Sequence, residues 1–411
     1  QLPRANSPIP TTGFYLQGAW INGTLDLNSL KLEHNLRCIK CVFSETLILF
    51  DARVDGNLNL QGSQCKKGIA ADGLKVTGNF FLRNNFAAHG EIRLLGATLG
   101  GNLDCRTARL ENPKSEALYA EGIDIRGHAL LRNGHFQGKF NFNHSHIHLG
   151  LDLRELSQPP DAIDLRHAQV GTLADDTNSW PSQKIFLDGL RYERLESSLT
   201  TKQRIQWLRT QTTPHSTRSP SFIPQPWQHV IRTLRHRGDR RMADEIAIAY
   251  ERQRRQHGQV YAQWLHRLFD VLMRFGYRPL RLLKFSGVVY LLGCLILWLG
   301  ANQGVFMPSQ TAAMRDIQEP ACERNWTQCT ALQRHYPSFK PLLHTLDLIF
   351  PVANLRQAGH WVVRTEAPPA ASTSYSYWAW MVEGMSILSV AYGCLWLAKW
   401  LFIRGGVVWF D

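Results

Sequence analysis

The chain has 411 residues, enough for two or three domains, and its hydrophobic content of 44% is ordinary for a soluble protein. Its net charge is +13, and most of the excess lies between Lys202 and Lys284, where 17 Lys and Arg stand against 5 Asp and Glu. This basic block directly precedes an apolar segment and carries no nucleic-acid motif. We therefore expect anionic lipid head groups as its partner and exclude nucleic acid. Because Gln1 is not a natural first residue, we expect further residues before it.

Residues 14–190 repeat a motif of the form small-x-apolar-x-Gly-x-apolar-x-apolar. Copies start at Ala19, Ala52 and Ala97, and a shorter copy is centred on Gly78. The intervals between motif glycines are close to multiples of 11. Alternation with a period of two predicts strands with one buried face, and a glycine at a fixed place predicts a bend or a close backbone approach.

One such unit cannot bury its apolar row alone, so stacked units must share a core. The repeat therefore predicts a right-handed, β-helix-like solenoid over residues 1–192, with about 22 residues per coil. We expect residues 1–20 to cap one end and residues 175–192 the other. The inward Leu and Phe resemble those of pentapeptide-repeat proteins, although the strict five-residue period is not kept. The DNA-mimic activity of some of those proteins needs an acidic surface and is not carried over.

Cys38 and Cys41 form a Cys-x-x-Cys, for which a redox pair or half of a metal site is the functional alternative. Cys65 and Cys105 lie too far along the repeat to complete a four-ligand site, and Cys105 occupies an inward position. We favour buried structural thiols for all of them.

His144, His146 and His148 alternate and are expected to share one strand face. Exposed solenoid surface is the favoured interpretation, and a metal patch is the alternative. The sequence shows no dinucleotide fingerprint, haem motif or nucleophile–base series, so we predict no catalytic residue, no cofactor and no metal.

Residues 193–284 are expected to form a basic helical neck. A polar helix over 200–211 and a Pro- and Ser-rich linker precede a hairpin of two helices, which Gly238 and Asp239 separate. A third amphipathic helix, over 260–275, either lies at the membrane interface or packs on the hairpin. The cations expected to contact anionic lipid are Arg267, Arg274, Arg278, Arg281 and Lys284.

Two apolar segments, 285–306 and 377–404, are each long enough to cross a bilayer. Basic residues flank their inner ends, so we expect both termini, including the tail 405–411, to be cytoplasmic and the loop 307–376 to be periplasmic. Small residues that let helices approach closely suggest an oligomer. They are Gly300, Gly304, Ser389 and Gly393.

The loop contains Cys322 and Cys329, which we expect to form a disulfide in an oxidising compartment. Its apolar segment 339–355 is too short to span and is either a re-entrant helix or part of a folded outer cap. Polar residues at or within the membrane are candidates to line a pore. They are Glu383, Asp347, Asn302 and Gln303.

Three stretches form a recognisable series with the solenoid: QPWQHVIRTLRHRGDRRMADEIAIAYERQRR, FGYRP and LDLIFPVANL. The series resembles a group of uncharacterised bacterial two-span inner-membrane proteins, some of them labelled membrane-associated oxidoreductases. The resemblance implies a bacterial inner-membrane protein. We expect an oligomer in which a cytoplasmic solenoid senses or docks a partner and is coupled to a membrane domain that forms a pore. The alternative is a membrane-anchored scaffold without transport, and an enzyme is the third hypothesis.

Overall fold

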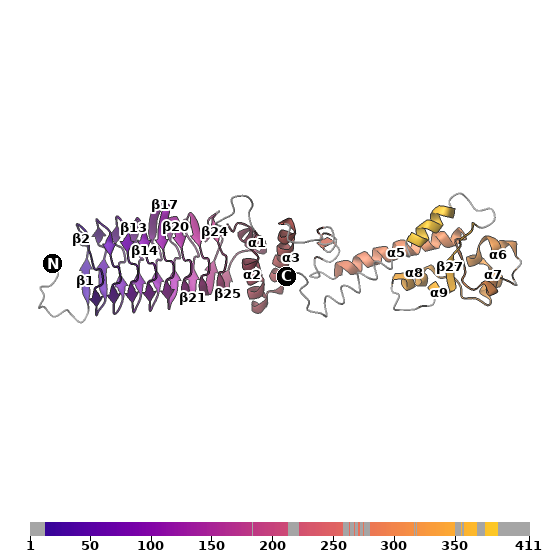
Figure 1. Cartoon of the computed structure of the whole chain (residues 1–411), viewed down its shortest axis with the longest axis horizontal. Coiled ribbons are helices and arrows are strands. Elements are labelled where there is room, and N and C mark those ends of the chain that lie inside the picture. The colour runs from indigo at the N-terminus through magenta and orange to yellow at the C-terminus, as the bar shows by residue number, and fades with distance from the viewer. Residues whose placement is uncertain are drawn as a thin grey trace. The chain divides into compact units, whose positions relative to one another are not determined.

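The structure is a computed structural model. It describes residues 13–182, 184–212, 222–257, 280–315, 319–349, 357–367 and 375–384, together with positions 263, 267, 270, 271, 274, 317 and 355. The chain divides into two compact units, Gln1–Gln263 and Trp264–Asp411, and each is described by itself (Figure 1).

The first unit contains a β-solenoid of about eight turns with about 22 residues in each, as the sequence predicts. Every strand pair in it is parallel, so each strand lies on the equivalent strand of the next coil; Leu36, for example, is opposite Leu58. A typical early coil has four short sides: β4 (Leu36–Ile39), β5 (Val42–Phe43), β6 (Leu47–Ile48) and β7 (Arg53–Val54). Each 11-residue half of a coil therefore supplies two sides.

The four sides of the early coils stack into two sheets. The first and fourth sides consist of β1 (Phe14–Gln17), β8 (Leu58–Asn59), β12 (Phe80–Phe81), β16 (Leu103–Asp104), β19 (His128–Leu130), β3 (Lys31–Leu32), β11 (Lys75–Val76), β15 (Thr98–Leu99) and β18 (Asp124–Ile125), with β4 and β7. The second and third sides consist of β2 (Trp20–Ile21), β9 (Gln64–Cys65), β13 (Ala87–His89), β10 (Ile69–Ala70) and β14 (Ile92–Arg93), with β5 and β6.

Longer strands join neighbouring sides in the later coils. Strand β17 pairs with both β13 and β14, and β21 pairs with both β18 and β19, so one strand replaces two sides. These later strands are β17 (Arg109–Tyr119), β20 (His135–Asn141), β21 (His146–Asp152), β22 (Ala162–Asp164), β23 (Gln169–Asp175), β24 (Ile185–Phe186) and β25 (Arg191–Ser197). The surface around β21 is thus shaped by a change in the cross-section of the coil.

The motif glycines Gly56, Gly78 and Gly101 lie where two neighbouring coils approach each other closely. Gly78 donates its N–H to the carbonyl oxygen of Gly56 at 2.8 Å, and Gly101 donates in the same way to Gly78. A Cβ on Gly78 would lie 2.8 Å from the Gly56 oxygen, which is closer than non-bonded carbon and oxygen approach. The predicted close approach is confirmed. An asparagine follows Gly56, Gly78 and Gly101, which the sequence reading missed. These asparagines form a side-chain ladder, in which Asn79 donates its N–H to Oδ1 of Asn57 at 2.8 Å.

The expected C-terminal cap is wrong, because β24 and β25 continue the coil through residues 175–192. Three helices follow instead: α1 (Thr201–Arg209), α2 (Pro224–Arg237) and α3 (Arg240–Gln256). Helix α2 packs on the edge strand β25 and supplies partners for its free backbone groups. His229 Nε2 lies 2.9 Å from the Tyr192 nitrogen, and Arg237 donates to the Leu195 oxygen at 2.8 Å. At the other end, residues 1–12 of the expected cap lie outside the described residues.

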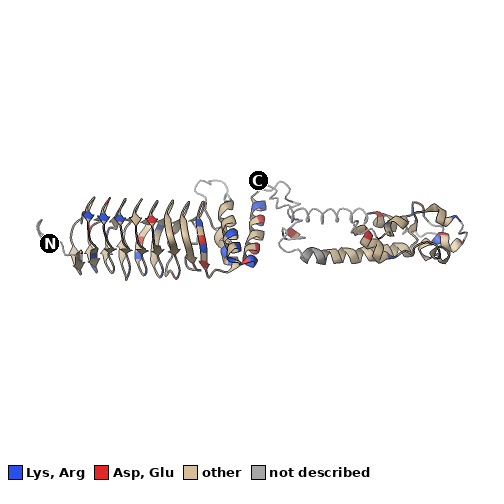
Figure 2. Ribbon diagram, turned by 90° about the horizontal axis from the view of Figure 1, so that it is seen from below, with Lys and Arg blue, Asp and Glu red and all other residues tan. Residues whose placement is uncertain are grey.

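The first helix of the hairpin ends, and the second begins, where the sequence predicts. Gly238 follows α2 with a φ of 91°, and Asp239 caps α3 by accepting a hydrogen bond from the Met242 N–H at 3.1 Å. Lys and Arg are frequent along α2 and α3 (Figure 2). The third amphipathic helix, over 260–275, lies almost wholly outside the described residues.

The second unit is built around α5 (Leu280–Asn302). A small mixed layer follows it: β26 (Phe306–Pro308), η1 (Thr311–Met314), α6 (Pro320–Arg324), η2 (Trp326–Gln328), α7 (Thr330–Gln333), α8 (Pro341–Ile349), α9 (Gln357–His360) and β27 (Trp361–Val363), then helical residues 375–384. Strands β26 and β27 are antiparallel. The helix expected to continue to residue 306 ends at Asn302, four residues earlier, because Gly304 turns the chain with a φ of 71°.

Candidate functional site

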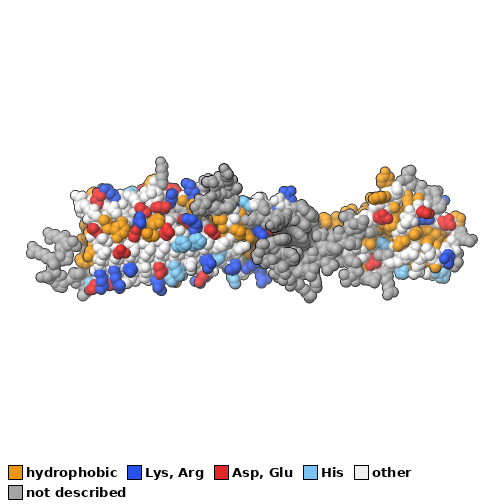
Figure 3. Space-filling view, viewed as in Figure 1, with side chains coloured by type: hydrophobic (Ala, Val, Ile, Leu, Met, Phe, Trp, Pro, Cys, Tyr) orange, Lys and Arg blue, Asp and Glu red, His pale blue; other side chains and the backbone are white. Residues whose placement is uncertain are grey.

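The described part of the solenoid gathers chemically active side chains on the outside of β18 and β21. Asp124 of β18 pairs in register with His146 of β21. His148 is two residues further along β21, so it points to the same side as His146. Its Nε2 atom lies 2.9 Å from Oδ1 of Asp124, and the two imidazole rings stack with centroids 3.9 Å apart. Figure 3 shows histidine side chains gathered on one face of the solenoid.

His144 does not join this group, so the expectation that three histidines share one strand face is wrong. It lies in the turn before β21 with a φ of 55°, and its ring stacks on that of His167 with centroids 4.8 Å apart. The alternation in sequence runs across a turn, where the period of two no longer applies.

A hollow of about 460 Å³ begins at Leu149, directly after His148, where β21 crosses from one side of the coil to the next. The register of β21 against β23 shifts between Ile147 and Gly150, which turns Leu149 outward, and this side chain is 51% exposed. The lining combines apolar and charged groups. The residues are His128, Leu130, Leu149, Gly150, Leu151, Asp152, Arg154, Thr172, Ala174, Arg194 and Glu196.

The charges in the hollow are held in place by one another. Arg154 contacts Asp152 at 2.8 Å and Glu196 at 3.8 Å. Burial raises the pKa of the Asp152 carboxyl, but hydrogen bonds from the Arg154 side chain and backbone outweigh it and bring the pKa below its usual value. The hollow therefore presents charges of both signs beside exposed apolar carbon, and Arg154 is held between Asp152 and Glu196.

The four cysteines of the solenoid lie in its core. Cys38, Cys41, Cys65 and Cys105 are each at most 1% exposed. Burial, with the nearby Cys41, raises the pKa of the Cys38 thiol to about 12, and burial also raises that of Cys65 to about 12. The reactive form of cysteine is the thiolate, so this environment opposes redox and metal chemistry at neutral pH.

In the second unit the four expected polar pore residues lie in different environments. Asp347 is buried on α8 and accepts a hydrogen bond from the Leu355 N–H at 2.8 Å. Glu383 is exposed on the helical segment 375–384. Asn302 is the last residue of α5, with Oδ1 3.4 Å from Gln328 Nε2, and Gln303 is exposed just beyond it. Asp347 thus has a backbone partner at Leu355, while Glu383 is the exposed carboxylate of the four. The pore role expected of these residues stays a prediction.

The expected helix-packing glycines separate into two roles. A Cβ on Gly300 would lie 3.3 Å from the Val382 side chain, so this glycine does face the segment 375–384. Gly304 is outside the helix, and a Cβ there would lie 2.5 Å from the Arg324 oxygen, so its expected packing role is wrong. Ser389 and Gly393 lie outside the described residues.

The basic residues expected to contact lipid are described only in part. Arg267 and Lys284 are exposed and Arg274 is half-buried. Arg281 lies within α5, and Arg278 falls outside the described residues.

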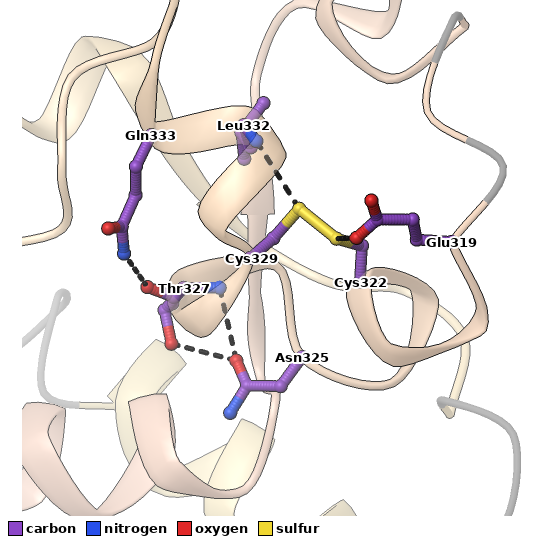
Figure 4. The surroundings of a disulfide bond; sticks show 7 residues. All are labelled: Glu319, Cys322, Asn325, Thr327, Cys329, Leu332 and Gln333. Atoms are coloured by element: carbon purple, nitrogen blue, oxygen red, sulfur yellow. Dashed lines mark hydrogen bonds between the residues drawn. A yellow bond between two sulfur atoms is a disulfide. The ribbon is translucent and has the colours of Figure 1, made fainter.

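The disulfide expected between Cys322 and Cys329 is present (Figure 4). It closes a loop whose residues hydrogen-bond to the end of α5. Asn325 Nδ2 donates to the Ala301 oxygen at 2.8 Å, and Thr327 Oγ1 donates to the same oxygen at 3.1 Å. These bonds add side-chain donors to a carbonyl of the last helical turn, which also accepts from the Gly304 N–H at 3.2 Å. The disulfide is therefore part of the connection between α5 and the layer that follows it.

Comparison of the chain with protein-family models, with curated proteins and with solved structures finds no match in any of the three. The geometry of the described residues is therefore the basis for a functional assignment.

Proposed function

We propose that the chain is a membrane-anchored docking protein, in which the second unit is embedded in a bilayer and the solenoid presents the hollow beside Leu149 to a protein partner. The observation that carries the proposal is the surface of α5. Its segment Lys284–Asn302 has a mean hydropathy of 1.7, yet only 22% of it is buried. Leu291 and Trp298 are 66% and 53% exposed.

This exposure argues against α5 being the core helix of a soluble domain. Such a helix buries its apolar side chains, at roughly 25 cal/mol for each Å² removed from water. A row of large apolar side chains left outside needs another apolar environment, and the length of the segment matches a bilayer. Hydrophobic side chains also lie on the surface of the second unit in Figure 3.

The basic residues between Lys202 and Lys284 support a cytoplasmic position for the solenoid in a bacterial inner membrane. The Cys322–Cys329 disulfide supports an oxidising, periplasmic position for the layer after α5. The proposed orientation follows from these two observations together.

Flotation tests the anchoring. Membranes from cells that express the chain are washed at alkaline pH and floated through a density gradient, which separates bilayer-embedded protein from aggregates. We expect the chain to float. Recovery of the folded chain in the soluble fraction would overturn the proposal.

Labelling of intact bacterial cells with a membrane-impermeant maleimide tests the orientation. Gln310→Cys, at an exposed position after α5, is expected to react in intact cells. Leu30→Cys, at a position 46% exposed on the solenoid, is expected to react only after lysis. The reverse pattern would refute the orientation.

A photo-reactive amino acid tests the docking surface. Placed at Leu149, it is expected to yield a discrete adduct with one protein in living cells. The same group at Leu30, on the first coil, is the matched control because Leu30 is similarly exposed. Equal adducts at both positions, or none at Leu149, would contradict docking in the hollow.

A pore is the second candidate function, and one contact favours it. Tyr290 Oη donates to the Leu342 oxygen at 3.2 Å, so the short apolar helix α8 starts beside the middle of α5 rather than beyond its end. This position of α8 beside α5 is the one expected of a re-entrant helix. Light scattering of the detergent-solubilised particle separates the two candidates: a ring of three or more chains supports the pore and a monomer refutes it.

A further inference from the structure

We propose that Asp124, His146 and His148 bind one divalent transition-metal ion, with Zn²⁺ the expected occupant, on the outside of the solenoid. The three side chains come from two adjacent coils: Asp124 from β18, and both histidines from β21. Each offers one ligand atom, and these atoms all lie within 4.8 Å of one another. The inference is independent of membrane anchoring, because it concerns the solenoid alone.

The backbone holds the three ligands on a fixed frame. Asp124 and His146 are directly opposite in a parallel pair of strands, and β21 is paired on its other side with β23, where Gln169 lies opposite His146. The ligand positions are therefore set by strands with neighbours on both sides. Only the side-chain torsions need to adjust to close the ligand atoms around an ion, and Zn²⁺ takes nitrogen and oxygen ligands at about 2.0–2.2 Å.

The donor set has the chemistry of an open metal site. Two neutral imidazoles and one carboxylate are the ligands of several three-residue zinc sites, which leave the fourth position to water or to an incoming group. The Asp124 carboxylate is partly shared, since Arg126 Nε is 4.0 Å from its Oδ2 atom. The contact of His148 is to the other oxygen, Oδ1, so the guanidinium and the histidine use different oxygens of the same carboxylate.

The proposed metal site lies beside the hollow that Leu149 lines. Leu149 follows His148 directly and lines the hollow, so an ion held by the histidines lies at its edge. An open coordination position there is available to an acidic or histidine side chain of a docked partner. The buried thiols of Cys38 and Cys65 do not compete for the ion, because their environment opposes the thiolate.

Calorimetric titration of the metal-free full chain in detergent with Zn²⁺ tests the proposal, using protein that carries no polyhistidine tag. We expect one ion per chain. His146→Gln, His148→Gln and Asp124→Asn should each weaken binding by more than about 100-fold, since even loss of an outer-sphere partner typically costs 10–100-fold. His144→Gln is the matched control. His144 is only two residues before His146, but its ring stacks on that of His167 and lies outside the group of three proposed ligands.

X-ray absorption of the Zn²⁺-loaded chain provides a second measurement that does not depend on the variants. We expect nitrogen and oxygen ligands and no sulfur. Sulfur ligation, the absence of saturable binding, or an equal loss of affinity in the His144→Gln control would overturn the proposal.

Discussion

The ion pair between Arg204 and Asp175 closes the C-terminal end of the solenoid, and breaking it should open that end. Both side chains are 0% exposed, and Arg204 Nη2 lies 2.8 Å from Asp175 Oδ1. Asp175 also accepts a hydrogen bond from Trp180 Nε1 at 2.8 Å, and Arg204 donates to Ser197 Oγ at 2.7 Å. The pair thus connects α1 to the strands β23 and β25.

Removal of one partner leaves the other charge buried without a counterion, which costs about 3–5 kcal/mol. We expect Asp175→Asn and Arg204→Met each to lower the local stability of the last coil by about 3 kcal/mol. The double variant buries no charge, so it should cost less than either single variant. A double variant that costs less than either single variant indicates a charge effect. If the single variants only lost packing, their two costs would add in the double variant.

Hydrogen–deuterium exchange read by mass spectrometry measures the effect where it occurs. A loss of about 3 kcal/mol should speed exchange in α1 and β25 by more than about 100-fold, since each 1.4 kcal/mol is a factor of ten. The strand β8, several coils away, is the internal control, because coils of a solenoid contact only their neighbours. Single variants that cost less than about 1 kcal/mol, or a double variant that costs the sum, would refute the reasoning.

Three further predictions concern the coil glycines, the disulfide and His229. Gly78→Ala should destabilise the solenoid by about 2 kcal/mol in urea unfolding, because the added Cβ would meet Gly56 of the preceding coil. Gly122→Asn, at a left-handed position with a φ of 65° and open space around it, should leave the stability unchanged. An equal loss of stability in the Gly78→Ala and Gly122→Asn variants would contradict this. Replacing Cys322 and Cys329 by serine should cost about 2 kcal/mol, because the bridge closes a short loop with a sequence separation of 7; unchanged thermal unfolding would contradict it. Burial lowers the pKa of His229, so the unfolded chain binds the proton more readily. The first unit should lose stability as the pH falls below about 6.5, and His229→Gln should remove that dependence in melting curves at several pH values.

The residues that could be read correctly from the sequence are those whose role is set by local chemistry. Period-two alternation fixes which side of a strand is buried, and Gly78 at a fixed place in the repeat indicates a close approach of two coils. Gly238 and Asp239 mark the ends of helices, because a left-handed residue stops a helix and a carboxylate accepts its free N–H groups. The pairing of Cys322 with Cys329 follows from there being two cysteines in one loop.

The errors arise where a role depends on what lies opposite in space. Residues 175–192 look irregular in sequence yet form coils, because the coil changes from four short sides to fewer and longer strands. Gly304 reads as helix packing in sequence, but it follows the end of the helix. His144 shares the alternation of His146 but not its strand.

The sequence by itself determined that this chain is a solenoid with a helical hairpin and an apolar helix, because periodicity, turn residues and length are properties of consecutive residues. Only the tertiary structure decided which histidines meet a carboxylate. Asp124 and His146 are 22 positions apart along the chain, and they become neighbours because one coil of the solenoid happens to take that number of residues. A site made across coils depends on the register of stacking, which the repeat suggests but which the pairing of β18 with β21 fixes.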